Sequence, residues 1–403
     1  MEELDGVKKV YLDHNATTPV HPEAVRAMLP YFGERFGNPS SVHSFGQEAR
    51  HALDEARGAV AAAIGARSDE IVFTSGGTEA DNLAVTGVAT ALAGKGRHII
   101  TSKIEHHAVL GTCQHLASFG FELTEVPCDG DGIVDPQSVR DAVRKDTVLI
   151  TIMHANNETG AIQPIDEIGK MALERGIVFH SDAVQSLGKL PLDVNALGVN
   201  LMSVSSHKVY GPKGVGALFV RRGTPLAPIT FGGHHERKRR AGTENVSGII
   251  GFAKAVELAT SDLEVTQARV LRLRLKLEEG VLAAVPHVRL NGHPTKRLPS
   301  TASLCFEFIE GESLVLSLDM EGIAVSSGSA CTSGSSEPSH VLMAMGVPPA
   351  VAQGSVRFSL GTENTESGVD YTLEVLPRIV ERLRAMSPLY RQSGTCVGEG
   401  TAG

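Results

Sequence analysis

Residues 199–222 read VNLMSVSSHKVYGPKGVGALFVRR, and this stretch decides the fold of the chain. Two short apolar runs, VNLMSVSS and GALFVRR, enclose a turn built from the GPKG tetrapeptide. Short apolar runs bounded by glycine and proline are typical of β-strands. Lys208 lies just beyond the first run. The stretch therefore predicts two strands with a lysine at the end of the first.

Upstream of this stretch, similar runs alternate with helical patterns. The expected helices cover 78–93, 108–120 and 166–176, and the expected strands before Lys208 cover 70–76, 98–104, 147–155 and 177–183. Strands that alternate with helices indicate βαβ units. We therefore predict an α/β fold with a large, doubly wound, mostly parallel sheet.

The pattern changes after about residue 247. Residues 247–285 carry helical periodicity for 39 residues, which is too long for one helix of a compact domain. We interpret this stretch as a bridge from a large domain, 18–262, to a smaller α+β domain formed by 1–17 and 263–390. The small and polar residues 391–403 are expected to form a disordered tail.

The composition restricts location and partners. The 403 residues carry a formal charge of −9, which disfavours nucleic acid as the main partner. The basic run at 237–240 is short and fits a solvated face. The first residues lack the charged and apolar regions of a secretory signal, and no apolar run reaches the roughly 20 residues that span a bilayer. We expect a cytoplasmic protein without a membrane partner.

One cysteine stands apart from the other four. Cys331 lies in SSGSACTSGSSEPSH, a stretch of serine, glycine and threonine, whereas Cys113 and Cys305 lie in apolar patterns that predict core positions. Cys128 is expected to end a strand, and Cys396 lies in the tail. An odd number without CxxC or zinc spacing indicates separate thiols in a reducing compartment. An exposed thiol on a polar loop is suited to carrying sulfur from one site to another.

Asp182 and Lys208 predict cofactor chemistry. Asp182 ends the expected strand 177–183, and the ends of parallel strands meet along one edge of a sheet. An aldehyde cofactor needs an amine and a carboxylate beside its pyridinium nitrogen. Gly77 and Thr78 open a helix straight after a strand, where backbone N–H groups favour a phosphate. By itself this glycine motif also fits an ordinary helix cap, but it matches neither the dinucleotide nor the Walker pattern.

Together these motifs resemble one enzyme family. SSHKVYGPKG (205–214), HSDAVQ (180–185), EHHAVL (105–110), HANNETG (154–160) and SSGSACTSG (326–334) are similar to those of cysteine desulfurases of the NifS/IscS group. YLDHNATTPV, FGNPSSVHSFG and RRAGTENV extend the resemblance over nearly the whole chain up to Leu389. It implies a class V aminotransferase fold of PLP fold type I, with pyridoxal 5'-phosphate as cofactor.

The resemblance implies a role for each matching residue. Lys208 is similar to the Schiff-base lysine and Asp182 to the carboxylate on the pyridine nitrogen. His106 is similar to the imidazole that stacks on the ring and moves protons. Arg357 is similar to the arginine that grips the substrate α-carboxylate, a task suited to a guanidinium. The remaining matching positions are Asn157 and Gln185 around the ring hydroxyl, with Asn157 also beside the substrate, and Thr78, Ser205, Ser206, His207 and Thr243 at the phosphate.

The implied activity is conversion of L-cysteine to L-alanine, with the sulfur kept as a persulfide on Cys331 for an iron–sulfur scaffold protein. The family supplies Thr243 from a second subunit, which implies a homodimer. The short tail favours a NifS-type role in nitrogen fixation, and a housekeeping IscS-like role or a selenocysteine lyase remains open. A shared iron–sulfur ligand is a further role considered for Cys331.

Four other points bear on the assignment. A plain aminotransferase needs no thiol, and a non-catalytic scaffold needs no Lys208 and Asp182. The segment after SLG lacks the arginine or aromatic residue common in the family, and Lys238 replaces a common glycine.

Overall fold

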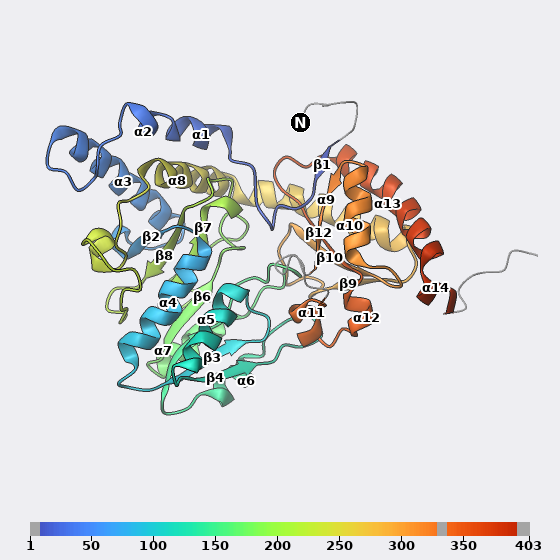
Figure 1. Cartoon of the computed structure of the whole chain (residues 1–403), viewed down its shortest axis with the longest axis horizontal. Coiled ribbons are helices and arrows are strands. Elements are labelled where there is room, and N and C mark those ends of the chain that lie inside the picture. Colours follow the sequence, from blue (N-terminus) through green and yellow to red (C-terminus); the bar gives the residue numbers. More distant parts are fainter. Residues whose placement is uncertain (1–8, 329–336, 393–403) are drawn as a thin grey trace, which may run out of the picture. The chain divides into compact units, whose positions relative to one another are not determined.

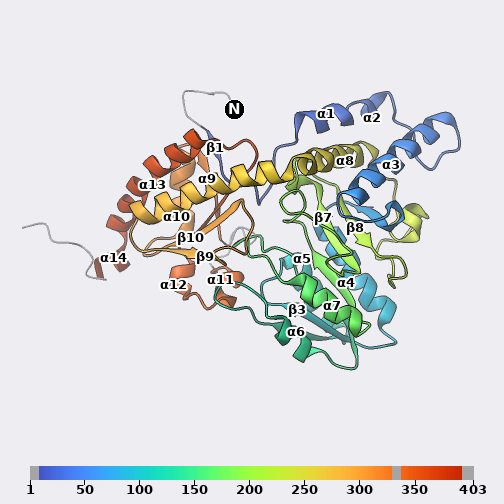
Figure 2. The same cartoon turned by 180° about the vertical axis from the view of Figure 1, so that it is seen from behind.

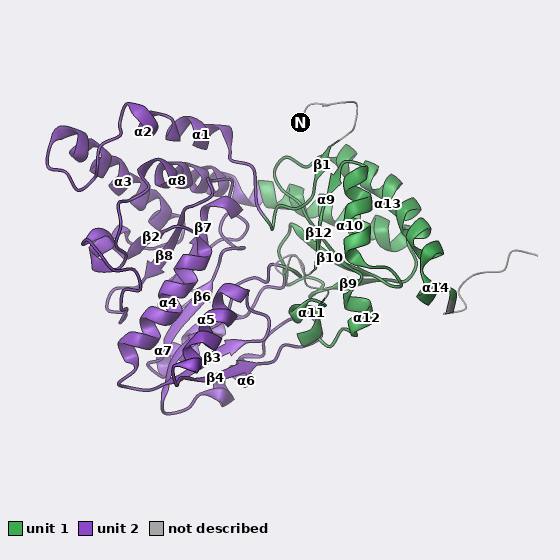
Figure 3. Cartoon of the chain, viewed as in Figure 1, with its two compact units in different colours: residues 1–16, 158–160, 266–403 green, residues 17–157, 161–265 purple. Residues whose placement is uncertain are grey.

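The structure is a computed structural model that describes residues 9–328 and 337–392. The chain divides into two compact units (Figure 3). The larger comprises 17–157 and 161–265, and the smaller comprises 1–16, 158–160 and 266–403. Most of the predicted tail lies outside the described residues, as do Cys331 and Cys396. Helix α14 (Pro388–Gln392) ends where the description ends.

A seven-stranded sheet forms the centre of the larger unit (Figure 1). The strand order is β2-β8-β7-β6-β5-β3-β4. Strand β8 is antiparallel to both of its neighbours, and the other pairs are parallel. The prediction of a mostly parallel α/β sheet is confirmed. The strands are β2 (Ile71–Thr74), β3 (His98–Ser102), β4 (Glu122–Val126), β5 (Thr147–Thr151), β6 (Val178–Asp182), β7 (Leu201–Ser205) and β8 (Gly216–Val220).

Helices cover both faces of this sheet (Figures 1 and 2). Helix α4 packs on strands β5 to β8. Its buried residues Ala80, Leu83, Ala84 and Val88 recur at helical spacing and join the core. Helix α7 packs against β6 and lies on the opposite face from α4. The helices are α1 (Pro22–Met28), α2 (Pro30–Gly33), α3 (Ser44–Ala62), α4 (Gly77–Leu92), α5 (His107–Ser118), α6 (Pro136–Ala142), α7 (Ile165–Glu174) and α8 (Val246–Ser261).

The long helical stretch near residue 262 is two helices. Helix α8 ends at Ser261, and α9 (Leu263–Ala284) begins two residues later. Asp262 between them has non-helical backbone angles. Serine and aspartate compete with the helix for backbone hydrogen bonds, which explains a break at this point.

The smaller unit has a four-stranded antiparallel sheet, ordered β12-β13-β10-β9, and a two-stranded parallel pair of β1 and β11. Its core joins Leu277 of α9, Phe306 of β10, Phe358 of β13 and Leu376 of α13. The strands are β1 (Val10–Tyr11), β9 (Val288–Asn291), β10 (Thr301–Phe306), β11 (Ile323–Ala324), β12 (Ser326–Ser327) and β13 (Ser355–Ser359). In addition to α9 and α14, the helices of this unit are α10 (Gly311–Met320), α11 (His340–Ala344), α12 (Pro349–Ala352) and α13 (Glu366–Met386). Across the described residues, no helix is both long and apolar enough to cross a membrane.

Candidate functional site

Asp182 and Lys208 lie at the ends of adjacent parallel strands. Asp182 is the last residue of β6 and pairs in register with Ser203 of β7. Lys208 ends the short 3-10 turn Ser206–Lys208 that follows β7. The Asp182 carboxyl is buried and accepts a hydrogen bond from the Val184 backbone N–H at 2.8 Å. Burial raises its pKa to about 6, while that N–H and the charge of Lys208 oppose the rise. The structure therefore brings the carboxyl and the amine within electrostatic reach.

The glycine motif forms a backbone cradle where α4 begins. The N-cap, Gly76, makes no side-chain cap hydrogen bond to the helix. A Cβ on Gly77 would lie 2.7 Å from Val184 Cγ2, and a Cβ on Gly216 would lie 2.6 Å from the Gly76 carbonyl carbon. Both glycines are therefore required for close approach of the backbones. Thr78, in the first turn of α4, is exposed.

Ser205, Ser206 and His207 lie together before Lys208. Ser205 Oγ is buried and has no hydrogen-bond partner among the described residues. The ring Nδ1 of His207 lies 3.2 Å from Thr17 Oγ1. Burial lowers the pKa of His207 to about 4, helped by the charges of Lys208 and Lys213. His207 is therefore neutral at physiological pH and can offer a phosphate an N–H but no charge.

His106 caps helix α5 with its side chain. Its Nδ1 accepts a hydrogen bond from the Ala108 backbone N–H at 3.1 Å. In the neutral ring the proton therefore lies on Nε2. The half-buried ring has a fixed tautomer, as a residue that moves a proton requires.

Asn157 and Gln185 are both buried. Gln185 Oε1 accepts a hydrogen bond from Lys189 Nζ at 2.8 Å, and Lys189 is itself buried. Lys189 is not among the site residues expected from the sequence, although its i+4 spacing from Gln185 is the spacing at which two side chains share one face of a helical turn.

In the smaller unit, Arg357 lies in the middle of β13. Its Nη2 donates to Asp13 Oδ1 at 3.0 Å, and the guanidinium is buried. Two residues farther along β13, Ser359 bridges to Asp13 and accepts at its Oγ from the Asn15 backbone N–H at 2.9 Å. The YLDHN segment therefore holds a carboxylate against the arginine that was predicted to grip the substrate.

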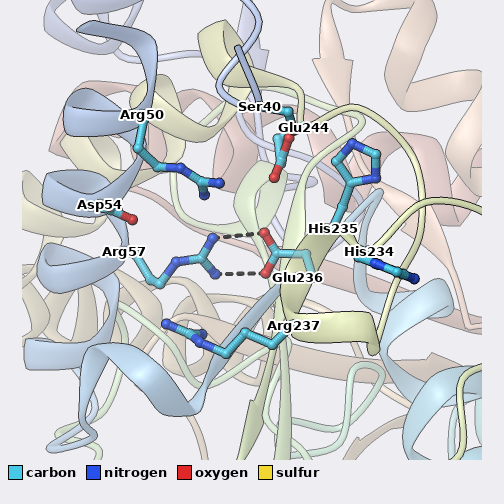
Figure 4. A pocket seen from close by; sticks show the side chains of 9 residues that line it. All are labelled: Ser40, Arg50, Asp54, Arg57, His234, His235, Glu236, Arg237 and Glu244. Carbon is cyan, nitrogen blue, oxygen red and sulfur yellow. Dashed lines mark hydrogen bonds and ion pairs between the residues drawn. The ribbon is translucent and has the colours of Figure 1, made fainter. Parts of the chain in front are cut away.

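Thr243 is exposed, as a residue that contacts another molecule must be. The next residue, Glu244, lines a pocket of about 470 Å³ in the larger unit (Figure 4). Arg57 and Glu236 face each other there at 2.6 and 2.7 Å. None of the predicted site residues lines this pocket. Its lining residues are Ser40, Arg50, Asp54, Arg57, His234, His235, Glu236, Arg237 and Glu244.

The three cysteines within the described residues are poor nucleophiles. Burial raises the pKa of the thiols to about 12 for Cys113 and about 11 for Cys128 and Cys305. The core positions predicted for Cys113 and Cys305 are confirmed. In residues 9–328 and 337–392, no group of three histidine, cysteine or acidic side chains could hold a metal ion.

These features fit pyridoxal phosphate. The buried Ser205 hydroxyl needs a hydrogen-bond partner, which a phosphate can be. The glycine cradle lets backbone approach an anion at a helix N-terminus. A buried carboxylate and an amine on adjacent strands match a pyridine ring and an aldehyde.

Comparison with known proteins gives one consistent result. The family model of the class-V aminotransferases matches residues 10–372. A curated relative named cysteine desulfurase IscS, from Dictyoglomus turgidum, is 54% identical over 385 residues, which cover 96% of this chain and 98% of the relative. A protein of the same name from Methanosarcina thermophila is 56% identical and covers 95% of this chain and 94% of the relative.

Solved structures agree in fold. A NifS-like protein superposes with a TM-score of 0.88 at 39% identity and covers 93% of this chain and all of that one. A second NifS-like protein, from Rickettsia africae, gives 0.84 at 31% identity with the same coverage. SspA, solved in complex with cysteine, gives 0.79 at 37% identity and covers 89% of this chain and all of that one.

Proposed function

The chain belongs to the class-V aminotransferase family and is a pyridoxal-phosphate-dependent cysteine desulfurase, and we propose that it keeps the sulfur of L-cysteine as a persulfide on Cys331. The observation that carries this function is the match along 96% of the chain to a cysteine desulfurase, together with the buried Asp182 next to Lys208.

The larger unit is the proposed cofactor-binding domain. Lys208 would hold the aldehyde through its amine, and Asp182 would keep a proton on the ring nitrogen. His106, Asn157 and Gln185 would surround the ring, and the phosphate would lie at the glycine cradle with Thr78, Ser205, Ser206 and His207. When bound, the cofactor supplies a ring that accepts electrons from the substrate Cα. Lys208, released by the incoming substrate amine, would be the base that takes the Cα proton.

Arg357 is the proposed partner of the substrate α-carboxylate. A buried guanidinium can bind a carboxylate with two parallel hydrogen bonds. Asp13 holds one nitrogen of Arg357, which supports a fixed orientation of the guanidinium plane. A fixed plane lowers the entropy that is lost when the substrate binds.

Cys331 is the proposed sulfur carrier. Its thiolate would attack the substrate sulfur, so that an S–S bond forms while the C–S bond of cysteine breaks. The electron pair of the broken bond would stay with the carbon, which takes up a proton before alanine is released. The raised thiol pKa values of Cys113, Cys128 and Cys305 support this choice because each of these thiols stays protonated at neutral pH.

An iron–sulfur scaffold is the proposed acceptor. The NifS-like name of two solved neighbours favours a nitrogenase-type role. The IscS name of the relatives favours housekeeping supply equally. Transfer of labelled sulfur to both kinds of scaffold, measured in competition, would decide between them.

A homodimer is the proposed assembly. Thr243 is exposed, as a residue that reaches a second subunit requires. The segment from α1 to α3 exposes Leu29, Phe32, Phe36 and Phe45, each at least 52% accessible. Exposed apolar side chains gathered along one segment mark interfaces. The unpaired thiols fit a reducing cytoplasm.

The experiment that tests this function is the Cys331→Ser variant. We expect it to bind cofactor and cysteine but to release alanine orders of magnitude more slowly, because a hydroxyl is a far weaker nucleophile than a thiolate. Single serine variants of Cys113, Cys128, Cys305 and Cys396 are the matched controls and should keep most of the rate. Mass spectrometry of the wild type after cysteine treatment should find one added sulfur on the Cys331 peptide.

Two results would contradict the proposal. A persulfide on Cys128 or Cys396, together with full activity in the absence of Cys331, would show that Cys331 is not the sulfur carrier. A Cys331→Ser variant that still releases alanine from cysteine, and selenium from selenocysteine, at the wild-type rate would favour the lyase alternative, which needs no protein thiol.

A further inference from the structure

A buried polar cluster lies beside Asp182 within the larger unit. His180 precedes Asp182 by two residues on β6, so both side chains leave the same face of the sheet. The His180 ring bridges the neighbouring strands. Its Nδ1 lies 2.8 Å from Thr151 Oγ1 on β5, and its Nε2 lies 2.9 Å from Ser203 Oγ on β7.

Asp81 of α4 faces this ring. The Asp81 side chain is only 2% exposed, and Oδ1 lies 3.6 Å from His180 Nε2. Oδ1 has no hydrogen-bond partner among the described residues. Burial lowers the pKa of His180 to about 3, so the ring is neutral and offers Asp81 no cation.

The charges around Asp81 oppose its ionisation. The titratable groups that face it are His180 and Asp182 from β6 and Glu105 after β3, and Lys208 supplies its positive charge to Asp182. A buried carboxylate that faces no cation and has one oxygen without a hydrogen bond is costly to ionise. Burial, followed by the charge of Asp182, raises the pKa of Asp81 well above its usual range, and a hydrogen bond from Ser203 partly opposes the rise.

We propose that Asp81 is a positioning residue for Asp182: Asp81 stays protonated and neutral, so that the negative charge beside the cofactor ring rests on Asp182 alone. Ionisation of Asp81 at alkaline pH breaks its O–H bond and gives the proton to solvent base. The added charge then raises the proton affinity of the ring nitrogen next to Asp182. This inference rests on the proposed role of Asp182.

The first test needs no cofactor. Infrared spectra of the apoprotein should show the C=O band of a protonated carboxylic acid at neutral pH. Asp81→Asn, a neutral isostere, should lose one component of this band. Glu105→Gln is the matched control and should lose a different component. Ser203→Ala, a smaller change, should keep the Asp81 component to higher pH, because the hydroxyl that stabilises the ionised form is gone.

The second test follows the ring nitrogen. With cofactor carrying ¹⁵N in the ring, nuclear magnetic resonance reports its protonation as a function of pH. Asp81→Asn should bind cofactor as the wild type does at neutral pH, and its ring nitrogen should lose the proton about one pH unit lower.

An unchanged infrared band in Asp81→Asn would overturn the proposal, and so would an unchanged ring-nitrogen profile. If Asp81→Asn does not fold, the Asp81 component of the C=O band is followed against pH in Ser203→Ala instead. Loss of this component at the same pH as in the wild type, or at a lower pH, would overturn the proposal. Asp182→Asn separates the two hypotheses. A wild-type ring-nitrogen profile in that variant would refute the role of Asp182, whereas the infrared result reports on Asp81 independently.

Discussion

The amine of Lys208 and the carboxyl of Asp182 come from strands that are neighbours in the sheet but 26 positions apart in the chain. Asp182 is the last residue of β6, and Lys208 ends the short turn that directly follows β7. The distance between the two groups is therefore set by the register of the two strands and not by a flexible loop. We therefore expect that another lysine of the larger unit cannot replace Lys208 as the amine that holds the cofactor.

Lys208→Ala should abolish alanine production, because the variant lacks the amine that is proposed to hold the cofactor aldehyde. Borohydride reduction of the wild-type holoenzyme followed by peptide mapping should label Lys208. Lys189 is the informative control, since it is buried and hydrogen-bonded to Gln185. Label on Lys189 or on the exposed Lys213 would show that Lys208 is not the lysine that holds the cofactor.

Glu105 gives a pH prediction at the same scale. Burial raises its pKa to about 8 in the folded chain, against a usual value of 4.5. Between these two values the folded chain holds a proton that the unfolded chain releases, so stability falls as pH rises from about 4.5 to about 8. The shift sets an upper limit of about 5 kcal/mol for this effect.

Glu105→Gln should remove that dependence, because the amide keeps the oxygen that accepts from Ser102 and Met153. In thermal unfolding of the apoprotein, the variant should exceed the wild type at pH 8 and match it at pH 5. Glu174→Gln, at the exposed end of α7, is the control and should show no difference. A gain of equal size at both pH values would mean that Glu105 is ionised in the fold.

At the scale of elements, strand ends were predictable because apolar runs bounded by turn residues carry a strong local signal. The break at Asp262 was not predictable, since residues 247–285 keep helical periodicity through it. The grouping of residues 158–160 with the smaller unit has no local signal either. Asp81 and His180 follow ordinary helix and strand patterns, and only the packing of α4 on the sheet brings them together.

The turn after His235 carries the clearest backbone strain. Glu236, Arg237 and Lys238 have φ values of 44°, 55° and 67°. The left-handed region costs residues with a Cβ roughly 1–2 kcal/mol, and glycine avoids most of this cost. Lys238 has no Cβ-free backbone to occupy this region without cost, so a glycine at position 238 would relieve part of the strain.

Lys238→Gly should therefore stabilise the protein by about 1 kcal/mol. Lys238→Ala removes the same charge but keeps a Cβ, so it should give no comparable gain. Chemical denaturation of both variants measures the difference. Equal stability of the two would show that the gain, if any, comes from lost charge and not from the backbone.

At the scale of the whole molecule, the proposed homodimer makes a prediction that neither unit makes alone. If Thr243 serves the phosphate of the neighbouring subunit, each active site needs Lys208 from one chain and Thr243 from the other. In a symmetric dimer both sites are built in this way. Two variants that are inactive for different reasons can then repair one site between them.

Lys208→Ala lacks the amine, and Thr243→Asp places a negative charge where the phosphate would lie. Each variant alone should be inactive. After the two are unfolded together and refolded at equal amounts, half of the dimers are mixed, and one of the two sites in each mixed dimer has both an intact Lys208 and an intact Thr243. The mixture should recover about a quarter of the wild-type rate. Sedimentation should show dimers throughout. No recovery from a mixture in which native mass spectrometry detects the mixed dimers would place Thr243 at the phosphate of its own chain. A fully active wild-type monomer at micromolar concentration would refute the shared site altogether.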